Sequence, residues 1–324
     1  MQEYLAKTLQ GLEGVLADEL RALGAKDIQV QRRAVSFKGD KKCLYKANFW
    51  LRTALRILKP VATFQVKGPD DVYTAIKKLK LEEFITADKT FSIDTTVYSE
   101  TINHSRYVTY KAKDAIVDYF SEKYGKRPSV SVANPDIYFN LHISHTTCTL
   151  SLDSSGAPLF KRGYRVAQTE APINEVLAAG LLMLSGWKGQ CDFIEPMCGS
   201  GTIAIEAAMI ALNMAPGLFR KEFAFERWAD FDRDMFDEIY NDDSQEREFK
   251  HKIYASDISA KAIGIANANI KSAGLAKYIE TQVIDMAELV KGKYLYYKNN
   301  IFYALTFHKL FYAKNPCTNY HTKY

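Results

Sequence analysis

The spacing of hydrophobic residues predicts alternating helices and strands over the first 165 residues of the chain. Apolar side chains at positions 12, 15, 16, 20 and 23 recur at helix spacing, and residues 90–97 alternate as a half-buried strand does. The same criteria predict strands at residues 4–6 and between 28 and 37, helices over 41–58, 69–79 and 111–124, and a hairpin over 137–152. This mixture is typical of small α+β units.

A stricter alternation of helix and strand begins at about residue 173. A helix over residues 173–184 precedes a short apolar strand that runs into Glu195 and then into Gly199-Ser200-Gly201. A helical pattern follows to Met214. After a polar insertion at residues 215–252 come a strand ending at Asp257, a helix over 259–272 and a strand over 279–285. This order predicts an α/β domain with a doubly wound parallel sheet.

The glycine turn between strand and helix has the form of a site for a nucleotide-like ligand, because glycines admit the ligand and free N–H groups face it. A dinucleotide site requires an acid at the end of a second strand about 20 residues on, but no such strand surrounds Glu222. Sites for S-adenosylmethionine (SAM) typically show an acid, three residues and Gly-x-Gly, as Glu195 and Gly199 to Gly201 do. Asp257 supplies a second acid whose two oxygens can accept from both ribose hydroxyls, so the pattern favours SAM.

Three stretches carry a resemblance to a known family. Residues 195–228 (EPMCGSGTIAIEAAMIALNMAPGLFRKEFAFERW), 161–165 (KRGYR) and 170–175 (EAPINE) resemble the THUMP-domain methyltransferases that form N2-methylguanosine in large-subunit (23S) ribosomal RNA. The resemblance implies a ferredoxin-like unit at residues 1–58, a THUMP RNA-binding domain at 59–165 and an incomplete Rossmann-like class I SAM methyltransferase domain at 166–290. It also implies SAM as cofactor and ribosomal RNA as partner.

The resemblance assigns roles to single residues. Asp285 stands where the family has an acid that accepts from the adenine amino group, with Met286 beside it. The implied cofactor-binding residues are Glu195, Pro196, Cys198, Gly199, Ser200, Gly201, Thr202, Asp257, Ile258, Asp285 and Met286. The expected RNA-binding residues are basic, and some flank an aromatic ring, which suits a nucleic-acid path: Lys126, Arg127, Lys161, Arg162 and Arg165.

Charge is distributed unevenly along the chain. The net charge is +5, but residues 1–165 carry +8, residues 166–290 carry −9 and residues 291–324 carry +6. A basic first half indicates a polyanionic partner, although +8 over 165 residues also suits an ordinary solvated surface. No apolar stretch is long enough to span a membrane, and the N-terminus lacks the form of a signal peptide. Five scattered cysteines fit a reducing cytoplasm.

Two further patterns invite a functional interpretation. His142-x-x-His145-x-x-Cys148 has a metal-like spacing, but it spans a strand, a turn and a strand without a fourth ligand, so no metal site is expected. The insertion at residues 215–252 is rich in acids and aromatics, and its rings are expected to lie in a core rather than to stack on bases.

The resemblance stops before the family's catalytic motif, which reads Asn or Asp, Pro, Pro and an aromatic on the fourth strand. No such sequence follows Asp285, and Pro316 is the only proline after Pro216. Residues 291–324 contain seven tyrosines, three phenylalanines and no acids. This composition indicates an atypical tail of the kind that a truncation or a shifted reading frame produces.

Two expectations follow from the missing motif. The first strand of the parallel sheet would lack a partner on one edge, which would leave Ile194 and its neighbours partly exposed. No catalytic residue can be assigned, so the chain as written is expected not to methylate RNA. Two functions stay open: a SAM-dependent RNA methyltransferase, and an RNA-binding protein with a vestigial methyltransferase half.

Overall fold

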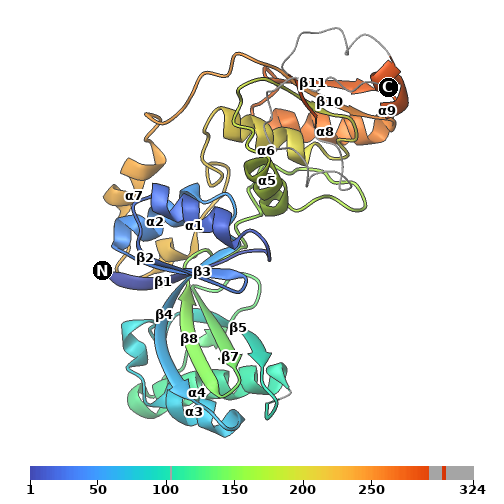
Figure 1. Cartoon of the computed structure of the whole chain (residues 1–324). Helices are drawn as coiled ribbons and strands as arrows, with labels where there is room; N and C mark the ends of the chain where they lie inside the picture. The colour runs from blue at the N-terminus through green and yellow to red at the C-terminus, as the bar shows by residue number, and fades with distance from the viewer. Residues whose placement is uncertain (103, 292–300, 304–324) are drawn as a thin grey trace.

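The computed structural model describes residues 1–102, 104–291 and 301–303 (Figure 1). The N-terminal half contains, in chain order, β1 (Gln2–Lys7), α1 (Glu13–Ala22), β2 (Lys26–Gln31), β3 (Ala34–Gly39), α2 (Lys41–Trp50), β4 (Arg56–Gln65), α3 (Pro69–Lys77), the 3₁₀ turn η1 (Leu81–Glu83), β5 (Thr90–Tyr98), α4 (Ser105–Tyr124), β6 (Ser129–Val130), β7 (Ile137–Ser144) and β8 (Thr147–Asp153). Its strands form one sheet in the order β2-β3-β1-β4-β8-β7-β5-β6.

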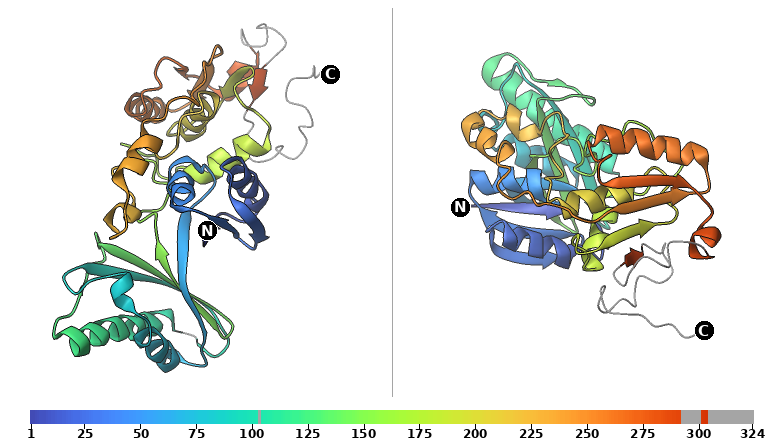
Figure 2. Two further views of the ribbon diagram at one scale, coloured as in Figure 1. Left: turned by 90° about the vertical axis from the view of Figure 1, so that its left-hand side faces the viewer. Right: turned by 90° about the horizontal axis from the view of Figure 1, so that it is seen from above.

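This single sheet joins the two small units that the sequence predicts. Strand β4 pairs with β1 on one side and with β8 on the other, and it runs across the expected boundary at residue 58. Helices α1 and α2 pack at one end of the sheet, and α3 and α4 pack at the other (Figures 1 and 2). The two N-terminal units are therefore continuous through their backbone hydrogen bonds.

The helix predicted over residues 41–58 is wrong in its second part, because α2 ends at Trp50 and β4 begins at Arg56. Leu58 pairs with Leu5 and with Asp153, so strand pairing on both sides outweighs the local helical spacing. Pro60 also cannot continue a helix. Helix α4 begins at Ser105, earlier than the pattern indicates.

The second half contains, in chain order, α5 (Glu175–Leu184), β9 (Asp192–Glu195), α6 (Thr202–Ala211), the 3₁₀ turn η2 (Ala224–Arg227), α7 (Arg233–Tyr240), β10 (Ile253–Asp257), α8 (Ala260–Ser272), β11 (Ile279–Val283), α9 (Met286–Lys291) and β12 (Ile301–Tyr303). The order α5-β9-α6-β10-α8-β11 is the predicted Rossmann-like alternation, whereas the sequence pattern does not predict η2, α7, α9 and β12. The strand order is β11-β10-β9-β12, and all pairs are parallel. Helix α6 contacts β9, β10 and β11, and α8 contacts β10 and β11.

The prediction of an unpaired edge on the first strand of this sheet is wrong. Strand β12 pairs with β9 through Ile301 and Asp192, Phe302 and Phe193, and Tyr303 and Ile194. Ile194 is only 1% exposed, since β12 continues the sheet beyond β9. Residues 292–300 and 304–324 lie outside the described residues, so the predictions about an atypical tail and a missing catalytic motif remain sequence-based.

Most aromatic rings of the insertion lie in a core, as expected, and the larger group of them shares the core of the N-terminal half. Phe219 and Phe249 pack instead on the core of the second half, and Tyr240 is 42% exposed. Phe225 is fully buried and stacks on Tyr45 of α2 with ring centroids 4.4 Å apart. Phe236 of α7 packs edge-on against Phe49 of α2. Figure 1 shows α7 beside α2, far along the chain from it. The middle of the insertion, from η2 to α7, therefore belongs structurally to the N-terminal half.

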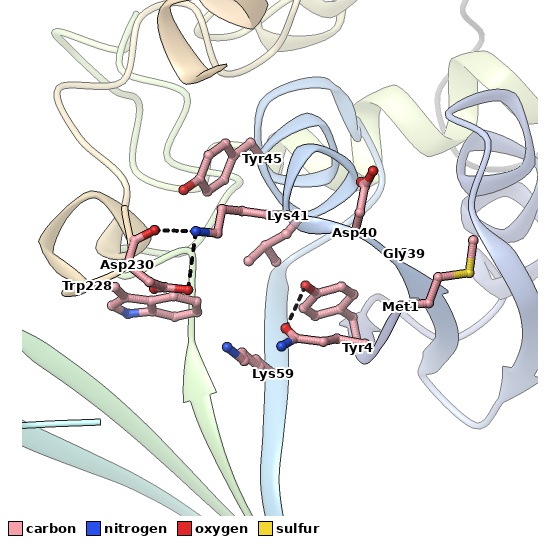
Figure 3. Close-up of a pocket in the computed structure, with 11 residues that line it drawn as sticks. Met1, Tyr4, Gly39, Asp40, Lys41, Tyr45, Lys59, Trp228 and Asp230 are labelled. Atoms are coloured by element: carbon pink, nitrogen blue, oxygen red, sulfur yellow. Dashed lines mark hydrogen bonds and ion pairs between the residues drawn. The ribbon is translucent and has the colours of Figure 1, made fainter. Parts of the chain in front are cut away.

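A cavity of about 210 Å³ lies at this junction, between β1, the start of α2, β4 and the insertion. Figure 3 shows the residues that line it. Lys41 forms an ion pair with Asp230, and the Lys59 ammonium lies 5.5 Å from the centre of the Trp228 ring. Asp40 and Asp230 balance the two lysines. This arrangement holds the insertion against the first unit.

Candidate functional site

Three acidic residues lie at or just after the carboxyl ends of three neighbouring parallel strands. Glu195 is the last residue of β9, Asp257 is the last residue of β10, and Asp285 follows β11. Asp257 is in register with Val283, and the N–H of Ile284 donates to the Asp257 carbonyl oxygen at 3.1 Å. Since the carboxyl ends of parallel strands share one edge, this edge is where an open α/β sheet binds a ligand.

The turn after β9 gives its two glycines different roles. Gly199 has φ +53°, and a side chain placed there would meet no atom within 4 Å. Gly201 has φ +78°, and a Cβ there would lie 3.2 Å from the Cβ of Ala266 on α8. Gly199 is therefore the position that leaves room for a ligand, whereas Gly201 permits close packing of the turn on α8.

Asp257 holds this turn in place while keeping capacity for a ligand. One carboxylate oxygen accepts from the Gly199 N–H at 3.0 Å, and the other accepts from the Ser259 N–H at 2.9 Å. Each oxygen of a carboxylate has two lone pairs, so each can accept a further hydrogen bond. Asp257 is thus suited to accept from neighbouring hydroxyls while it fixes the turn.

Glu195 serves the fold of the site. Its side chain is 3% exposed, and Oε2 accepts from the Ala204 N–H in the first turn of α6 at 2.9 Å. Burial, with a smaller effect of nearby Asp257, raises the pKa of Glu195 to about 8. Glu195 therefore holds the first turn of α6 from inside the domain, and its buried carboxyl group is not exposed to a ligand at the strand ends.

The raised pKa of Glu195 predicts a pH dependence of stability. The unfolded chain loses this proton near the ordinary value of 4.5, whereas the folded chain keeps it to about 8. Because the folded state binds the proton more tightly, this group lowers the free energy of unfolding as pH rises through that window. Glu195→Gln should lose less stability than wild type between these two pH values, measured by denaturant unfolding. Glu100→Gln, at an exposed site, should follow wild type, and a Glu195→Gln curve parallel to wild type would contradict the assignment.

Exposed apolar side chains flank the carboxylates at the same edge. Ile258, directly after Asp257, is 69% exposed, and Met286, directly after Asp285, is 39% exposed. Exposed apolar groups beside a few polar ones are the usual lining of a site for a flat base. Asp285 is exposed and accepts from the Ala287 N–H at 2.8 Å. Pro196 and Cys198 are buried under the turn, so their side chains support it from inside.

Two of the five residues predicted to bind RNA are instead engaged with acidic groups of the protein, Arg162 in full burial and Arg165 in partial burial. Arg162 is 2% exposed, with Nε 3.4 Å from Oε1 of Glu206 on α6, and it also donates to the Arg52 carbonyl oxygen. Arg165 is bound to Glu175, Ser200 and Thr202. Buried acids on α5 and α6 draw these arginines inward, which their position beside Tyr164 does not reveal. Lys126, Arg127 and Lys161 are exposed, as RNA contact requires.

The metal-like spacing does not bring its residues together. His142 pairs with Thr149 and Cys148 pairs with Ile143 in the β7–β8 hairpin, so His142 and Cys148 point to opposite faces of the sheet. His145 lies at the turn with φ +54°. The spacing of these three residues in the sequence therefore follows from the register of the hairpin and does not form a metal site.

Asn269 is a site residue that the sequence pattern does not single out. It is fully buried on α8, donates to the Ser200 carbonyl oxygen at 3.0 Å, and accepts from the N–H groups of Val166 and Ala167. It therefore ties the segment after Arg165 to the glycine turn. Its signal in the sequence is a single amide on the otherwise apolar face of α8.

Comparison with known proteins agrees with this fold. Family models match residues 3–58 as an RlmL ferredoxin-like domain, residues 66–153 as a THUMP domain, and residues 162–295 as an RMKL-like methyltransferase domain. "Putative RNA methyltransferase slr0064" of Synechocystis is 37% identical over 288 residues, which is 88% of this chain and 75% of that protein. "Ribosomal RNA large subunit methyltransferase K/L" of Syntrophotalea carbinolica is 38% identical over 89% of this chain, which spans only 41% of that protein's length.

A solved structure shares the fold over most of this chain. SMU.472, "a putative methyltransferase complexed with SAH" (S-adenosylhomocysteine), is 29% identical with a TM-score of 0.81, over 93% of this chain and 79% of that one. Fold and site together define a Rossmann-like methyltransferase domain that follows a ferredoxin-like unit and a THUMP domain. The chain belongs to the family of THUMP-domain RNA methyltransferases with an RMKL-like methyltransferase domain. Within the described residues, none of the helices combines the length and the apolar character that crossing a membrane requires.

Proposed function

We propose that the chain binds SAM at the ends of β9, β10 and β11 and binds structured RNA through residues 1–165, with residues 166–290 as the SAM-binding unit. The observation that carries this proposal is the hydrogen bond from Gly199 to Asp257 beside open space at Gly199. The SAH-bound relative supports it. Titration of the full chain with SAH tests it directly.

The residues present fit the cofactor by their chemistry. SAM supplies an activated methyl group when it is bound. Asp257 would accept from the ribose hydroxyls, and Asp285 would accept from the adenine amino group. Ile258 and Met286 would cover the base, and Gly199 would admit the amino-acid end near the first N–H groups of α6. The protein's part in methyl transfer is then to bind and orient both substrates.

The RNA proposed is ribosomal RNA of the large subunit, and the cytoplasm is the proposed place of action. Guanine N2 is the methyl acceptor proposed for members of the family that carry the complete catalytic motif. The THUMP match at residues 66–153 supports an RNA partner, and the name of the K/L relative supports the large subunit. Lys126, Arg127 and Lys161 are the exposed cations proposed to contact phosphates.

Binding of a structured ribosomal RNA fragment to the full chain should weaken steeply as salt rises, because bound phosphates release their counterions. Replacing Lys126 and Arg127 by Gln should lower the slope of log affinity against log salt by roughly 0.9 for each phosphate that is no longer neutralised, measured by fluorescence anisotropy. Lys188→Gln, an exposed cation in the other half, is the control that should leave the slope unchanged. Salt-independent binding would contradict the proposal. The full chain is required, because the insertion completes the N-terminal core.

The 324-residue polypeptide contains no Asn/Asp-Pro-Pro-aromatic sequence to hold a guanine. Incubation with labelled SAM and unmodified large-subunit RNA should therefore leave the RNA unlabelled, even where both ligands bind. A relative that carries the motif is the positive control. Clear incorporation into guanosine would show that other residues hold the base.

A further inference from the structure

Arg165 connects the segment before the catalytic domain to the glycine turn. Its Nη1 donates to the Ser200 hydroxyl at 3.0 Å, and its Nη2 donates to the Thr202 hydroxyl at 2.9 Å. Nε donates to Oε1 of Glu175 at 2.8 Å, and Nη2 also donates to the Ile173 carbonyl oxygen. One planar guanidinium thus binds acceptors on the start of α5 and on both sides of Gly201.

The two hydroxyls that Arg165 binds are enclosed by protein. Ser200 is 3% exposed and Thr202 is 1% exposed, so their side chains face Arg165. What the turn can offer a ligand is therefore its backbone. The conformation of that backbone is fixed at Gly199 by Asp257 and at Ser200 and Thr202 by Arg165.

The segment that carries Arg165 is itself held in place from both sides. Asn269 accepts from the backbone of Val166 and Ala167, while Tyr164 donates to Glu206 on α6 at 3.1 Å. The backbone on either side of Arg165 is therefore fixed, which limits where its guanidinium can lie. A lysine would keep the charge opposite Glu175, but a single ammonium group lacks the planar fork that reaches three side-chain acceptors at once.

We propose that Arg165 is a positioning residue that sets the glycine turn for the amino-acid end of the cofactor, through the hydroxyls of Ser200 and Thr202. This inference rests on the proposed SAM site. The ribose and adenine contacts come from Asp257 and Asp285, on β10 and after β11. Loss of Arg165 should therefore weaken ligands that carry the amino-acid end and spare ligands that lack it.

The test compares two ligands by calorimetry on the full chain: SAH, and 5′-methylthioadenosine, which lacks the amino-acid end. Arg165→Lys should bind SAH about tenfold more weakly, the equivalent of losing one or two hydrogen bonds, and should bind methylthioadenosine within about twofold of wild type. Thr202→Val removes the hydrogen bond between Arg165 and the Thr202 hydroxyl without disturbing the buried charge of Glu175. It should also weaken SAH more than methylthioadenosine, but by a smaller factor than Arg165→Lys does. Because both changes remove one interaction, the double variant should bind SAH only as weakly as Arg165→Lys alone.

Gln168→Ala, an exposed neighbour in the same segment, is the control and should bind both ligands like wild type. Equal SAH affinity in wild type and Arg165→Lys would overturn this inference alone. Equal losses for both ligands would also overturn it, since they would reflect a general disturbance of the fold. A wild-type chain that binds neither ligand would contradict the proposed cofactor site itself, and this inference with it.

Discussion

Phe225→Ala should lower the free energy of unfolding by ~3–5 kcal/mol, the cost of removing a large aromatic ring from a closed core. Phe225 is fully buried, stacks on Tyr45 at 4.4 Å and on Phe223 at 5.3 Å, and meets Phe236 edge-on at 5.1 Å. All four rings lie in the same cluster. The space left by an alanine would have walls from α2 and from the insertion, including its helix α7, and neither part can close it alone.

Denaturant unfolding of the full chain measures this loss. Tyr110→Ala, at a site that is 53% exposed, is the control and should change stability by less than about 1 kcal/mol. Because Phe225 packs on α2, the N-terminal half and the insertion should unfold in one transition, and its midpoint should shift to a lower denaturant concentration. A Phe225→Ala curve that overlays wild type would mean that the insertion contributes little to the N-terminal core.

Asp257→Ala should weaken SAH binding by ~1.5–3 kcal/mol, the range for a charge-assisted hydrogen bond, or roughly 10- to 150-fold. The variant removes the proposed acceptor for the ribose hydroxyls. It also releases the N–H groups of Gly199 and Ser259, so the turn loses its support at the same time. Asp257→Asn keeps one acceptor oxygen and should fall between wild type and Asp257→Ala.

Equilibrium dialysis with labelled SAH measures these affinities. Asp243→Ala removes an exposed carboxylate of the insertion and is the matched control for net charge, so its affinity should equal that of wild type. Asp257→Ala binding SAH as tightly as wild type would show that the ribose contacts lie elsewhere.

The sequence predicts best the features that depend on near neighbours in the chain. The glycine turn, the strand that ends at Asp257 and the Ser259 cap of α8 all match the structure, because turn and cap chemistry are local. The hairpin of β7 and β8 is likewise encoded by adjacent alternating strands.

Features that depend on distant partners are missed. Residues 56–58 read as the end of a helix but pair with β1 and β8 as a strand. Arg162 reads as a surface cation until Glu206, buried on α6, is found beside it. Gly201 and Gly199 look equivalent in the motif, yet only the position of Ala266 shows which one packs on α8. Local spacing carries no information about such contacts.

The central claim is that the edge formed by Glu195, Asp257 and Asp285 is a SAM site and not a dinucleotide site. Calorimetric titration of the full chain with SAH and, separately, with NADH tests it most directly. We predict saturable binding of SAH, lost or strongly weakened in Asp257→Ala, and no binding of NADH. Binding of NADH, or the absence of SAH binding in a folded wild-type chain, would contradict it.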